Sequence, residues 1–581
     1  MVTSNNISPA FQSPLLSGKD EVVEDNVDYK GRPAKRAQSG GWLSASFIIG
    51  VEMAEFFAYY GVSANLITYL TGPLGQSTAT AAENVNVWSG TAMLMPLLGA
   101  FVADSFLGRY RTIVVASVLY ILALGLLALS AIIPSFNTFN CENASNSSIP
   151  CPPPQLQITT FFFSLYLIAI AQGLHKPCIH AFGADQFDGS DTKECKAKSS
   201  FFNWCNVGTC VSVTLALVIL TYIQDDLSWG LGFGIPCLVM VLALVWFVLG
   251  TVTYRFHSTN DQGQGKPFSR ISLVFLKAAK NWRITSSALH VDVENQDVLP
   301  HLGSQQFMFL DKALLSPDGS MEEGKVCSRI EVEEAKAILR LFPIWLSCLV
   351  YGIVFSQPPT LFTKQGLTMD RFITPKFEVP AASLQSFTSV TIIVFLCMYD
   401  RLLVPAARAL TGKSSGITML QRIGTGIFFS ILSVLAAALV EKRRLETVKE
   451  YGLVESPNAV VPMSVAWLIP QYLLLGVSQA FTIAGLQEFF YDQMPNGLRS
   501  TGLALYLTIF GIGGFLSSIL ISVIENTTGG GSDGDHWFSD NPMKGHLDYF
   551  YWLLVGLSAV SFTAFVYFAK GYTYRNKQLL S

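Results

Sequence analysis

The sequence predicts an all-α membrane protein with twelve transmembrane helices. Hydrophobic residues occupy 50% of the 581 positions and charged residues only 14%, whereas soluble proteins average about 25% charged residues. Apolar stretches close to the roughly 20 residues that cross a bilayer recur along the chain. These stretches lack the alternation typical of barrel strands, and lipid does not tolerate unpaired backbone groups, so we expect helices.

The predicted spans differ in strength. Four contain no charged residue, namely 113–134, 229–254, 500–524 and 551–569. Eight are weaker or interrupted, namely 43–70, 85–106, 158–180, 201–223, 338–358, 380–399, 416–440 and 462–489.

A polar segment of about eighty residues divides the spans into six and six. Two bundles related by an axis along the membrane normal are the plan of the major facilitator fold. The segment mixes expected helices at 270–283 and 328–340 with loop composition. The predicted parts are an N-terminal tail (1–41), an N-terminal six-helix bundle (42–254), a connector (255–335), a C-terminal six-helix bundle (336–572) and a C-terminal tail (573–581).

The distribution of Lys and Arg predicts that both termini are cytoplasmic, because these residues accumulate on the inner side of membrane proteins. The tails and most of the short loops assigned to that side are basic. One basic cluster, Lys442, Arg443, Arg444 and Lys449, falls on the opposite side. We attribute it to an extension of the ninth helix beyond the membrane.

Glycosylation and cysteine patterns agree with this topology. The triplets that begin at Asn143, Asn146 and Asn526 match the glycosylation acceptor pattern and fall in predicted outer loops. Cys141 and Cys151 share one of these loops, where an oxidising compartment could join them in a disulfide.

Two carboxylates interrupt the first predicted span. Glu52 and Glu55 are three residues apart, hence on one helical face, and Tyr59 and Tyr60 follow them. Each ionisable group inside a membrane costs about 2.5–3.5 kcal/mol on insertion scales. Two carboxylates in one low-dielectric site cannot both ionise cheaply, so one of them is expected to carry a proton. The alternative is that they pair with cations and only hold helices together.

A single lysine, Lys176, interrupts the fourth predicted span. The glycine and proline around it are expected to loosen the helix, as at transporter binding sites. Its ammonium is predicted to attract an anionic group of a solute or to neutralise one of the two carboxylates. His175 and His180 lie nearby and are interpreted as structural.

Several functional classes are excluded by what the sequence lacks. A net charge of −3, with charges crowded into loops, argues against a nucleic-acid-binding protein. No nucleotide motif, metal-ligand set or nucleophile constellation is evident, so neither an enzyme nor a cofactor or metal is expected. The expected partners are a small-molecule solute, protons and the lipid bilayer, with energy taken from a gradient.

Three sequence segments, at 99–113, 182–188 and 201–204, resemble signatures of the proton-dependent oligopeptide transporter family. More closely, the chain resembles the plant branch, the nitrate transporter/peptide transporter family, from about Gly41 to the last span. The resemblance implies a proton-coupled major facilitator symporter for peptides, nitrate, hormones or secondary metabolites.

The chain departs from this family pattern at three positions. The family follows its two first-span glutamates with Arg or Lys, but Phe56 stands here, which leaves Lys176 as the nearby cation. The resemblance places Gln479 where peptide carriers have a glutamate for the substrate amino group. It places Phe355 where a histidine is associated with nitrate binding. Proton coupling and uncoupled transport therefore both stay open.

The leading hypothesis is a secondary transporter that moves nitrate, a di- or tripeptide or another small organic anion by alternating access, coupled to protons. An uncoupled facilitative carrier and a solute sensor that signals through the connector are the alternatives. The expected substrate-binding residues are Tyr59, Tyr60, Lys176, Phe355 and Gln479. The expected proton-coupling residues are Glu52 and Glu55, and the expected gating residues are Asp104, Arg109, Asp185 and Asp188.

Regulation and location are constrained by two short signals. Thr112 follows two arginines and is a candidate phosphorylation site for the sensor hypothesis, although an ordinary threonine at a helix start is the simpler interpretation. The segment 13–16 resembles a dileucine sorting signal before an acidic stretch. The plasma membrane and the vacuolar membrane both stay open.

Overall fold

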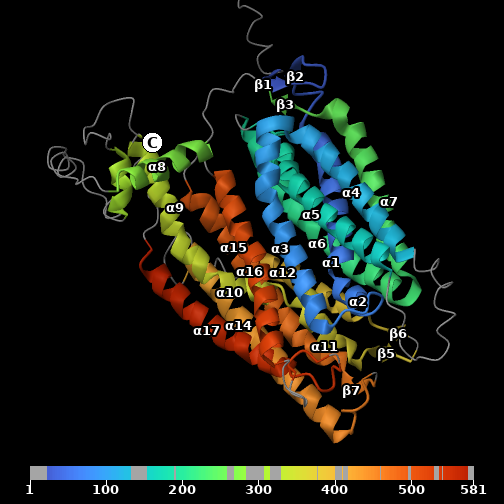
Figure 1. Ribbon diagram of the computed structural model, residues 1–581. Coiled ribbons are helices and arrows are strands. Elements are labelled where there is room, and N and C mark those ends of the chain that lie inside the picture. The colour runs from blue at the N-terminus through green and yellow to red at the C-terminus, as the bar shows by residue number, and fades with distance from the viewer. Residues whose placement is uncertain are drawn as a thin grey trace, which may run out of the picture.

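The computed structural model describes residues 22–132, 154–188, 191–257, 267–282, 307–314, 327, 329–375, 377–399, 409, 417–457, 459–494, 499–528, 536–539 and 541–572. Helices dominate these residues and form two groups that lie side by side, one blue to green and one yellow to red (Figure 1). This arrangement confirms the predicted all-α, two-bundle membrane architecture.

The N-terminal group comes from the first half of the chain. Its helices and short helical turns are α1 (Gly41–Ser63), α2 (Leu66–Thr71), α3 (Thr78–Val102), η1 (Ala103–Leu107), α4 (Arg109–Ile132), α5 (Gln155–Ala184), α6 (Thr192–Leu215), η4 (Ala216–Leu220), η5 (Ile223–Leu227), α7 (Trp229–Leu249) and η6 (Gly250–Thr253).

The connector contributes α8 (Pro267–Lys280) and η7 (Met308–Leu314). The C-terminal group consists of α9 (Arg329–Ser347), α10 (Leu349–Phe355), η8 (Pro358–Phe362), α11 (Thr363–Leu367), η9 (Ala381–Gln385), α12 (Ser386–Met398), α14 (Met419–Glu450), η11 (Val465–Leu468), α15 (Ile469–Gln493), α16 (Arg499–Thr528) and α17 (Leu547–Lys570). Helix α9 crosses the boundary predicted at 335/336, so the connector passes into the second bundle without a break.

Helical structure lies over each of the twelve predicted spans. Within the described residues, ten helices are long and apolar enough to cross a membrane. The predicted seventh span is a pair of helical segments, Glu331–Ser347 and Leu349–Leu367, that bend by 46°. The predicted eighth span is a shorter apolar helix, Ala381–Leu396. The protein is thus a multi-pass membrane protein.

Short strands mark the two ends of the bundles. The polar tail, for which no strand is predicted, forms β1 (Val22–Val27) and β2 (Pro33–Lys35), which join β3 (Phe256–His257) in an antiparallel sheet of order β2-β1-β3. We call this the sheet end (top in Figure 1). The opposite, or far, end holds the parallel pair of β4 (Met369–Asp370) and β7 (Val461–Ser464) and the antiparallel pair of β5 (Phe372–Thr374) and β6 (Phe377–Glu378).

A buried arginine fastens the tail to the sheet end. The Nε group of Arg255 donates to the carbonyl of Ser39 (3.0 Å), and its Nη1 donates to the carbonyl of Gln186 (3.2 Å). Gly40 lies against it with φ of 76°, and a Cβ there would come within 2.2 Å of the Arg255 Nε. Only glycine suits this position, because it combines a left-handed backbone with close approach to another side chain.

Helix α14 carries the basic cluster that the sequence assigns to the outer side. It begins with a capping box between Thr418 and Gln421 and continues for 32 residues to Glu450. At 1.5 Å per residue this is about 48 Å, whereas the hydrocarbon core is about 30 Å thick. Its end projects from the far end (Figure 1), so the helix is long enough for the predicted extension beyond the membrane.

Glycines bring the two halves into close contact. Gly90 of α3 faces Gly511 of α16, where an added Cβ would lie 2.7 Å from the Gly511 carbonyl oxygen. Within the C-terminal half, Gly352 of α10 meets Gly513 of α16 in the same way, with backbone atoms 2.5 Å from the Cβ position. Backbone approach of this kind is the usual basis of tight helix packing in lipid.

Gly90→Ala is expected to destabilise the protein by about 1–3 kcal/mol, because the added methyl has to push α3 away from α16. Gly234→Ala on α7 is the matched control, since nothing lies within 4 Å of its Cβ position. The control is expected to be neutral or to gain up to about 1 kcal/mol of helix propensity. Thermal unfolding of the two purified variants in detergent measures the difference. Equal melting temperatures would contradict the packing role of Gly90.

Candidate functional site

Helix α1 carries the predicted acidic face into the protein interior. Glu52 and Glu55 are 2% and 1% exposed, and Tyr59, one turn further, is also buried. Their spacing of three and four residues places them on one side of the helix. Lys176 of α5 interacts electrostatically with both carboxylates. The three buried side chains and the half-buried Lys176 form one group, which we call the central cluster.

The ammonium of Lys176 is held by aromatic rings. Its Nζ atom lies 5.1 Å from the ring centroid of Phe56 and 5.3 Å from that of Tyr59. Both distances are typical of cation–π contacts, which contribute about 0.5–2 kcal/mol. Phe56 stands at the position where the resembled family carries a cation. It therefore makes a cation–π contact with Lys176, the only lysine of the fourth span.

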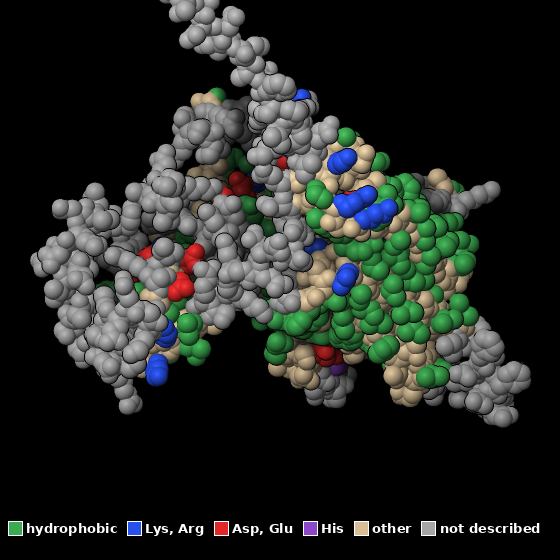
Figure 2. Space-filling model, turned by 90° about the horizontal axis from the view of Figure 1, so that it is seen from above, with side chains coloured by type: hydrophobic (Ala, Val, Ile, Leu, Met, Phe, Trp, Pro, Cys, Tyr) green, Lys and Arg blue, Asp and Glu red, His purple; other side chains and the backbone are tan. Residues whose placement is uncertain are grey.

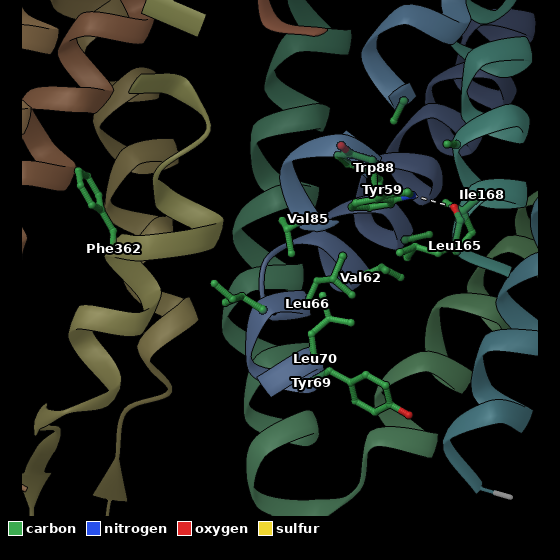
Figure 3. Close-up of a cluster of buried hydrophobic side chains, with 14 of the residues drawn as sticks. Tyr59, Val62, Leu66, Tyr69, Leu70, Val85, Trp88, Leu165, Ile168 and Phe362 are labelled. Carbon is green, nitrogen blue, oxygen red and sulfur yellow. Dashed lines mark hydrogen bonds between the residues drawn. The ribbon is translucent and has the colours of Figure 1, made fainter. Parts of the chain in front are cut away.

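Stacked rings fix the position of Tyr59. Its ring stacks on Trp88 of α3 with centroids 5.4 Å apart, and Trp88 Nε1 donates to the carbonyl of Leu165 at 2.7 Å (Figure 3). Tyr60 meets Tyr59 edge-on at 5.5 Å. Three helices thereby hold the phenol ring beside Lys176 in a defined orientation.

The histidine interpreted as structural lies in direct contact with the site. His180 Nε2 is 3.3 Å from Glu52 Oε1, and the side chain is 43% exposed. The thiol of Cys205 on α6 lies near both residues. Its Sγ atom, a carboxylate oxygen of Glu52 and a ring nitrogen of His180 all lie within 4.8 Å of one another. A usable signal was present in the sequence, because His180 follows Lys176 by four residues and so shares its helix face.

The glycine beside Lys176 has a packing role. Helix α5 is continuous from Gln155 to Ala184 through Pro177, so the helix is not opened at this point. A Cβ on Gly99 of α3 would lie 2.0 Å from the carbonyl oxygen of Gly173. Gly173 therefore permits close approach of α3 and α5, which differs from the loosening predicted for it.

Two predicted substrate-binding residues belong to the C-terminal half. Phe355 ends α10 and packs on Phe510 of α16, with ring centroids 4.6 Å apart. Gln479 is half-buried on α15. The contacts of the described residues do not join either side chain to the central cluster.

The predicted gating residues fall into two groups at the sheet end. Arg109, at the start of α4, forms an ion pair with Asp185, at the end of α5. Asp188 instead pairs with Arg36 of the tail at 2.5 Å. Asp104 lies in η1, and its side chain is outside the described part of the structure.

The second group, which is centred on Arg36, could not be predicted from the sequence. Arg36 also approaches Asp191 (3.6 Å) and Glu194 (3.5 Å), and Glu194 receives a 2.8 Å ion pair from Arg255. The group links the tail, α6 and the segment after α7. Predicting it required the fold of the tail, which polar composition alone does not indicate.

Lys and Arg side chains gather at the sheet end of the N-terminal half, inside a broad hydrophobic surface (Figure 2). Exposed Arg111 and Lys193 belong to this end. The hydrophobic surface includes leucines more than half exposed, such as Leu122, Leu238 and Leu242, which suits contact with lipid.

Thr112 is fully buried, and its hydroxyl donates to the carbonyl of Gly108 at 2.9 Å. A kinase cannot reach this hydroxyl in the described conformation. The geometry matches the interpretation as an ordinary threonine at a helix start.

The outer-loop predictions are only partly covered. Asn143, Asn146, Cys141 and Cys151 lie outside the described residues. Asn526 is exposed near the end of α16.

Comparison with known proteins identifies the family. The PTR2 model, described as the POT family, matches residues 110–534. The chain belongs to the POT family. It is 59% identical over 546 residues to protein NRT1/PTR FAMILY 5.10 of Arabidopsis thaliana, covering 94% of this chain and 95% of the relative. Protein NRT1/PTR FAMILY 5.13 of the same plant is 50% identical over 562 residues, covering 96% and 98%.

Solved POT structures share the fold. An auto-inhibited POT family peptide transporter superposes with a TM-score of 0.67 at 21% identity, covering 93% of this chain and 99% of that one. A POT family transporter in complex with 5-aminolevulinic acid gives 0.60 at 18% identity, covering 95% and 98%. This POT family chain is therefore a membrane transporter for small solutes and not an enzyme.

Proposed function

We propose that the protein moves a small anionic solute, such as nitrate or the carboxylate end of a peptide, by proton-coupled alternating access. The observation that carries this proposal is the position of Lys176. Its ammonium lies over two aromatic rings and forms no ion-pair contact with a described carboxylate, although Glu52 and Glu55 are its electrostatic neighbours. Such an ammonium attracts an anion strongly, because little water competes for it.

Proton coupling is supported by the two carboxylates of the central cluster. Both Glu52 and Glu55 are almost completely buried, and both Glu52 oxygens lack a hydrogen-bond partner. One lysine cannot neutralise two buried carboxylates, so binding of a proton reduces the uncompensated charge. In the proposed cycle, solute occupies Lys176 while a proton occupies the acidic pair.

Alternating access is supported by contacts between the halves that gather toward the far end. Gln385 Nε2 donates to the carbonyl of Ala64 at 3.0 Å, and Lys364 Nζ donates to Thr71 Oγ1 at 3.0 Å. Rocking of the two bundles would break these hydrogen bonds. The proposed role of Arg109, Asp185 and Asp188, with Asp104, is to stabilise one conformation from the sheet end.

Solved relatives agree with a small anionic solute. POT family structures have been obtained in complex with sulfate and with 5-aminolevulinic acid. Sulfate is an anion and 5-aminolevulinic acid carries a carboxylate. We place Tyr59 and Tyr60 beside Lys176 as substrate-binding residues on the N-terminal side, and Phe355 and Gln479 on the C-terminal side.

The orientation of the protein in the membrane is proposed from the distribution of Lys and Arg. We propose that the sheet end is cytoplasmic, because Lys and Arg gather there (Figure 2). In the plasma membrane a proton gradient would then drive import, and in the vacuolar membrane it would drive export to the cytosol.

Proteoliposomes test the proposed function directly. An inward-directed proton gradient is expected to drive uptake of labelled nitrate or of a labelled dipeptide above the level reached at equal pH. Glu52→Gln is expected to remove that gradient-dependent part, because the amide cannot bind the coupled proton. Uptake that is identical with and without the gradient would identify an uncoupled carrier, for which the absence of a cation at Phe56 is the supporting observation. Solute binding without flux would identify a sensor.

A further inference from the structure

His180 places a partly exposed imidazole beside the buried acid Glu52. Its Nε2 atom lies 3.3 Å from Glu52 Oε1, and its side chain is 43% exposed, whereas Glu52 is 2% exposed. Helix α5 ends at the sheet end, two turns or less beyond His180. The imidazole therefore occupies the boundary between the central cluster and the solution at the sheet end.

The cluster has two layers along the membrane normal. Glu52 and His180 form the layer nearer the sheet end, and Glu55 and Lys176 form the layer deeper in the bundle. The layers are separated by three residues on α1 and by four residues on α5, which is about one helical turn of 5.4 Å. Each layer thus pairs one carboxylate with one nitrogen base, and the His180 side chain is 43% exposed whereas Lys176 is half-buried.

Several titratable groups of the described residues surround this pair, among them the phenols of Tyr59, Tyr60 and Tyr120 near Glu55. Helix α1 presents Glu52 and Glu55, helix α5 presents Lys176 and His175, and helix α6 presents Cys205. His175 is fully buried and neither ring nitrogen has a partner. His180 is the one base among these groups that combines contact with a carboxylate and exposure to solvent.

We propose that Glu52 and His180 together hold the coupled proton, and that His180 passes it to the solution at the sheet end. The inference rests on the proposed proton coupling and names the group that performs the exchange. The carboxyl O–H of Glu52 gives its proton to His180 Nε2, which leaves a carboxylate beside an imidazolium. Nδ1 is buried in the described conformation, so a turn of the ring has to present Nε2 to the solution. The imidazolium then gives the Nε2 proton to water and returns to the neutral ring. Histidine is the side chain suited to proton exchange near neutral pH.

His180 thus provides beside the glutamates a positive charge that the family has at the position of Phe56. The resembled family places a fixed cation directly after the second glutamate, whereas here the positive charge beside the acids is fixed at Lys176 and titratable at His180. A titratable cation releases its carboxylate when it loses its proton, which a lysine or arginine does not do near neutral pH.

Two substitutions test the exchange. His180→Gln keeps the size and polarity of the side chain but cannot titrate, and His180→Lys keeps a positive charge but cannot exchange it near neutral pH. In proteoliposomes, both variants are expected to lose at least about tenfold of the uptake of labelled nitrate or dipeptide driven by a proton gradient, because a positioned proton-transfer group typically contributes about a hundredfold or more to the step it serves. Both are expected to keep solute exchange at equal pH on the two sides, because this exchange moves no net proton.

His546→Gln is the matched control, since His546 also lies beside a carboxylate, Asp548 at 3.5 Å, but at the far end. It is expected to keep driven uptake. Driven uptake that persists in His180→Gln would overturn the inference and leave the proposed function intact. Driven uptake that persists only in His180→Lys would show that His180 acts as a fixed cation, which also overturns it. A wild-type protein without gradient-driven uptake would reject the proposed coupling and the inference together.

Discussion

Lys176→Ala is expected to abolish transport of an anionic solute at physiological concentrations. In the proposed function the ammonium is the cation that binds the solute, and it lies half-buried over the rings of Phe56 and Tyr59. Truncating one partner of a buried charge pair costs about 2–5 kcal/mol, which weakens binding by at least roughly thirtyfold. The loss is expected mainly in KM for uptake of labelled nitrate or dipeptide.

Two further lysine variants separate charge from folding. Lys176→Arg keeps the positive charge and is expected to retain part of the uptake, although the planar guanidinium does not match the cation–π geometry of an ammonium. Lys193→Ala removes an exposed lysine from the sheet end and is expected to leave uptake unchanged. An unaltered KM in Lys176→Ala, with the protein correctly folded, would remove this lysine from the solute site.

Arg444→Met is expected to destabilise the protein by about 3–5 kcal/mol, because it leaves a buried carboxylate without its partner. Arg444 and Glu441 are 1% and 0% exposed and are joined by two hydrogen bonds of 2.5 and 2.9 Å. Arg444 Nη2 also donates to the carbonyl of Pro542 at 3.0 Å, so the pair fastens the extension of α14 to the segment before α17. Thermal unfolding in detergent measures the loss.

The neighbouring arginine provides the comparison. Arg443 pairs with Glu446 and Glu450 at 3.2 Å on the exposed side of the same helix turn. Arg443→Met is expected to cost at most about 1 kcal/mol, as exposed ion pairs do. The double variant Glu441→Leu with Arg444→Met is expected to recover much of the lost stability, since no charge is left buried. Equal melting temperatures for the Arg443 and Arg444 variants would contradict this account.

Much of the fold could be predicted because lipid imposes a strong constraint on composition. The uncharged stretch 229–254 predicts α7 directly, and the basic cluster around Arg443 predicts the extension of α14. The strands β1 and β2 could not be predicted, because their partner β3 is more than 200 residues away and the tail has no apolar alternation. Pairing over such a distance depends on where the bundle places its ends.

The candidate site was predictable where a charge stands in an apolar context. Glu52, Glu55 and Lys176 could be found in this way, and the structure brings them together. His180 escaped because a histidine carries no formal charge at pH 7 and so leaves no mark in a hydropathy profile. Its spacing of four residues from Lys176 was the signal available in the sequence, but the 3.3 Å contact with Glu52 joins two helices and so depends on the fold.

Phe56 also determines how the empty carrier responds to membrane voltage. With both carboxylates ionised and His180 neutral, the formal charges of Glu52, Glu55 and Lys176 sum to −1, and a proton on His180 brings the sum to zero. One elementary charge that crosses the full field experiences about 2.3 kcal/mol per 100 mV. A basic residue in place of Phe56 would make the cluster neutral without that proton. In the proposed transport cycle, reorientation of the empty carrier is therefore expected to be electrically silent when His180 is protonated and voltage-dependent when it is not.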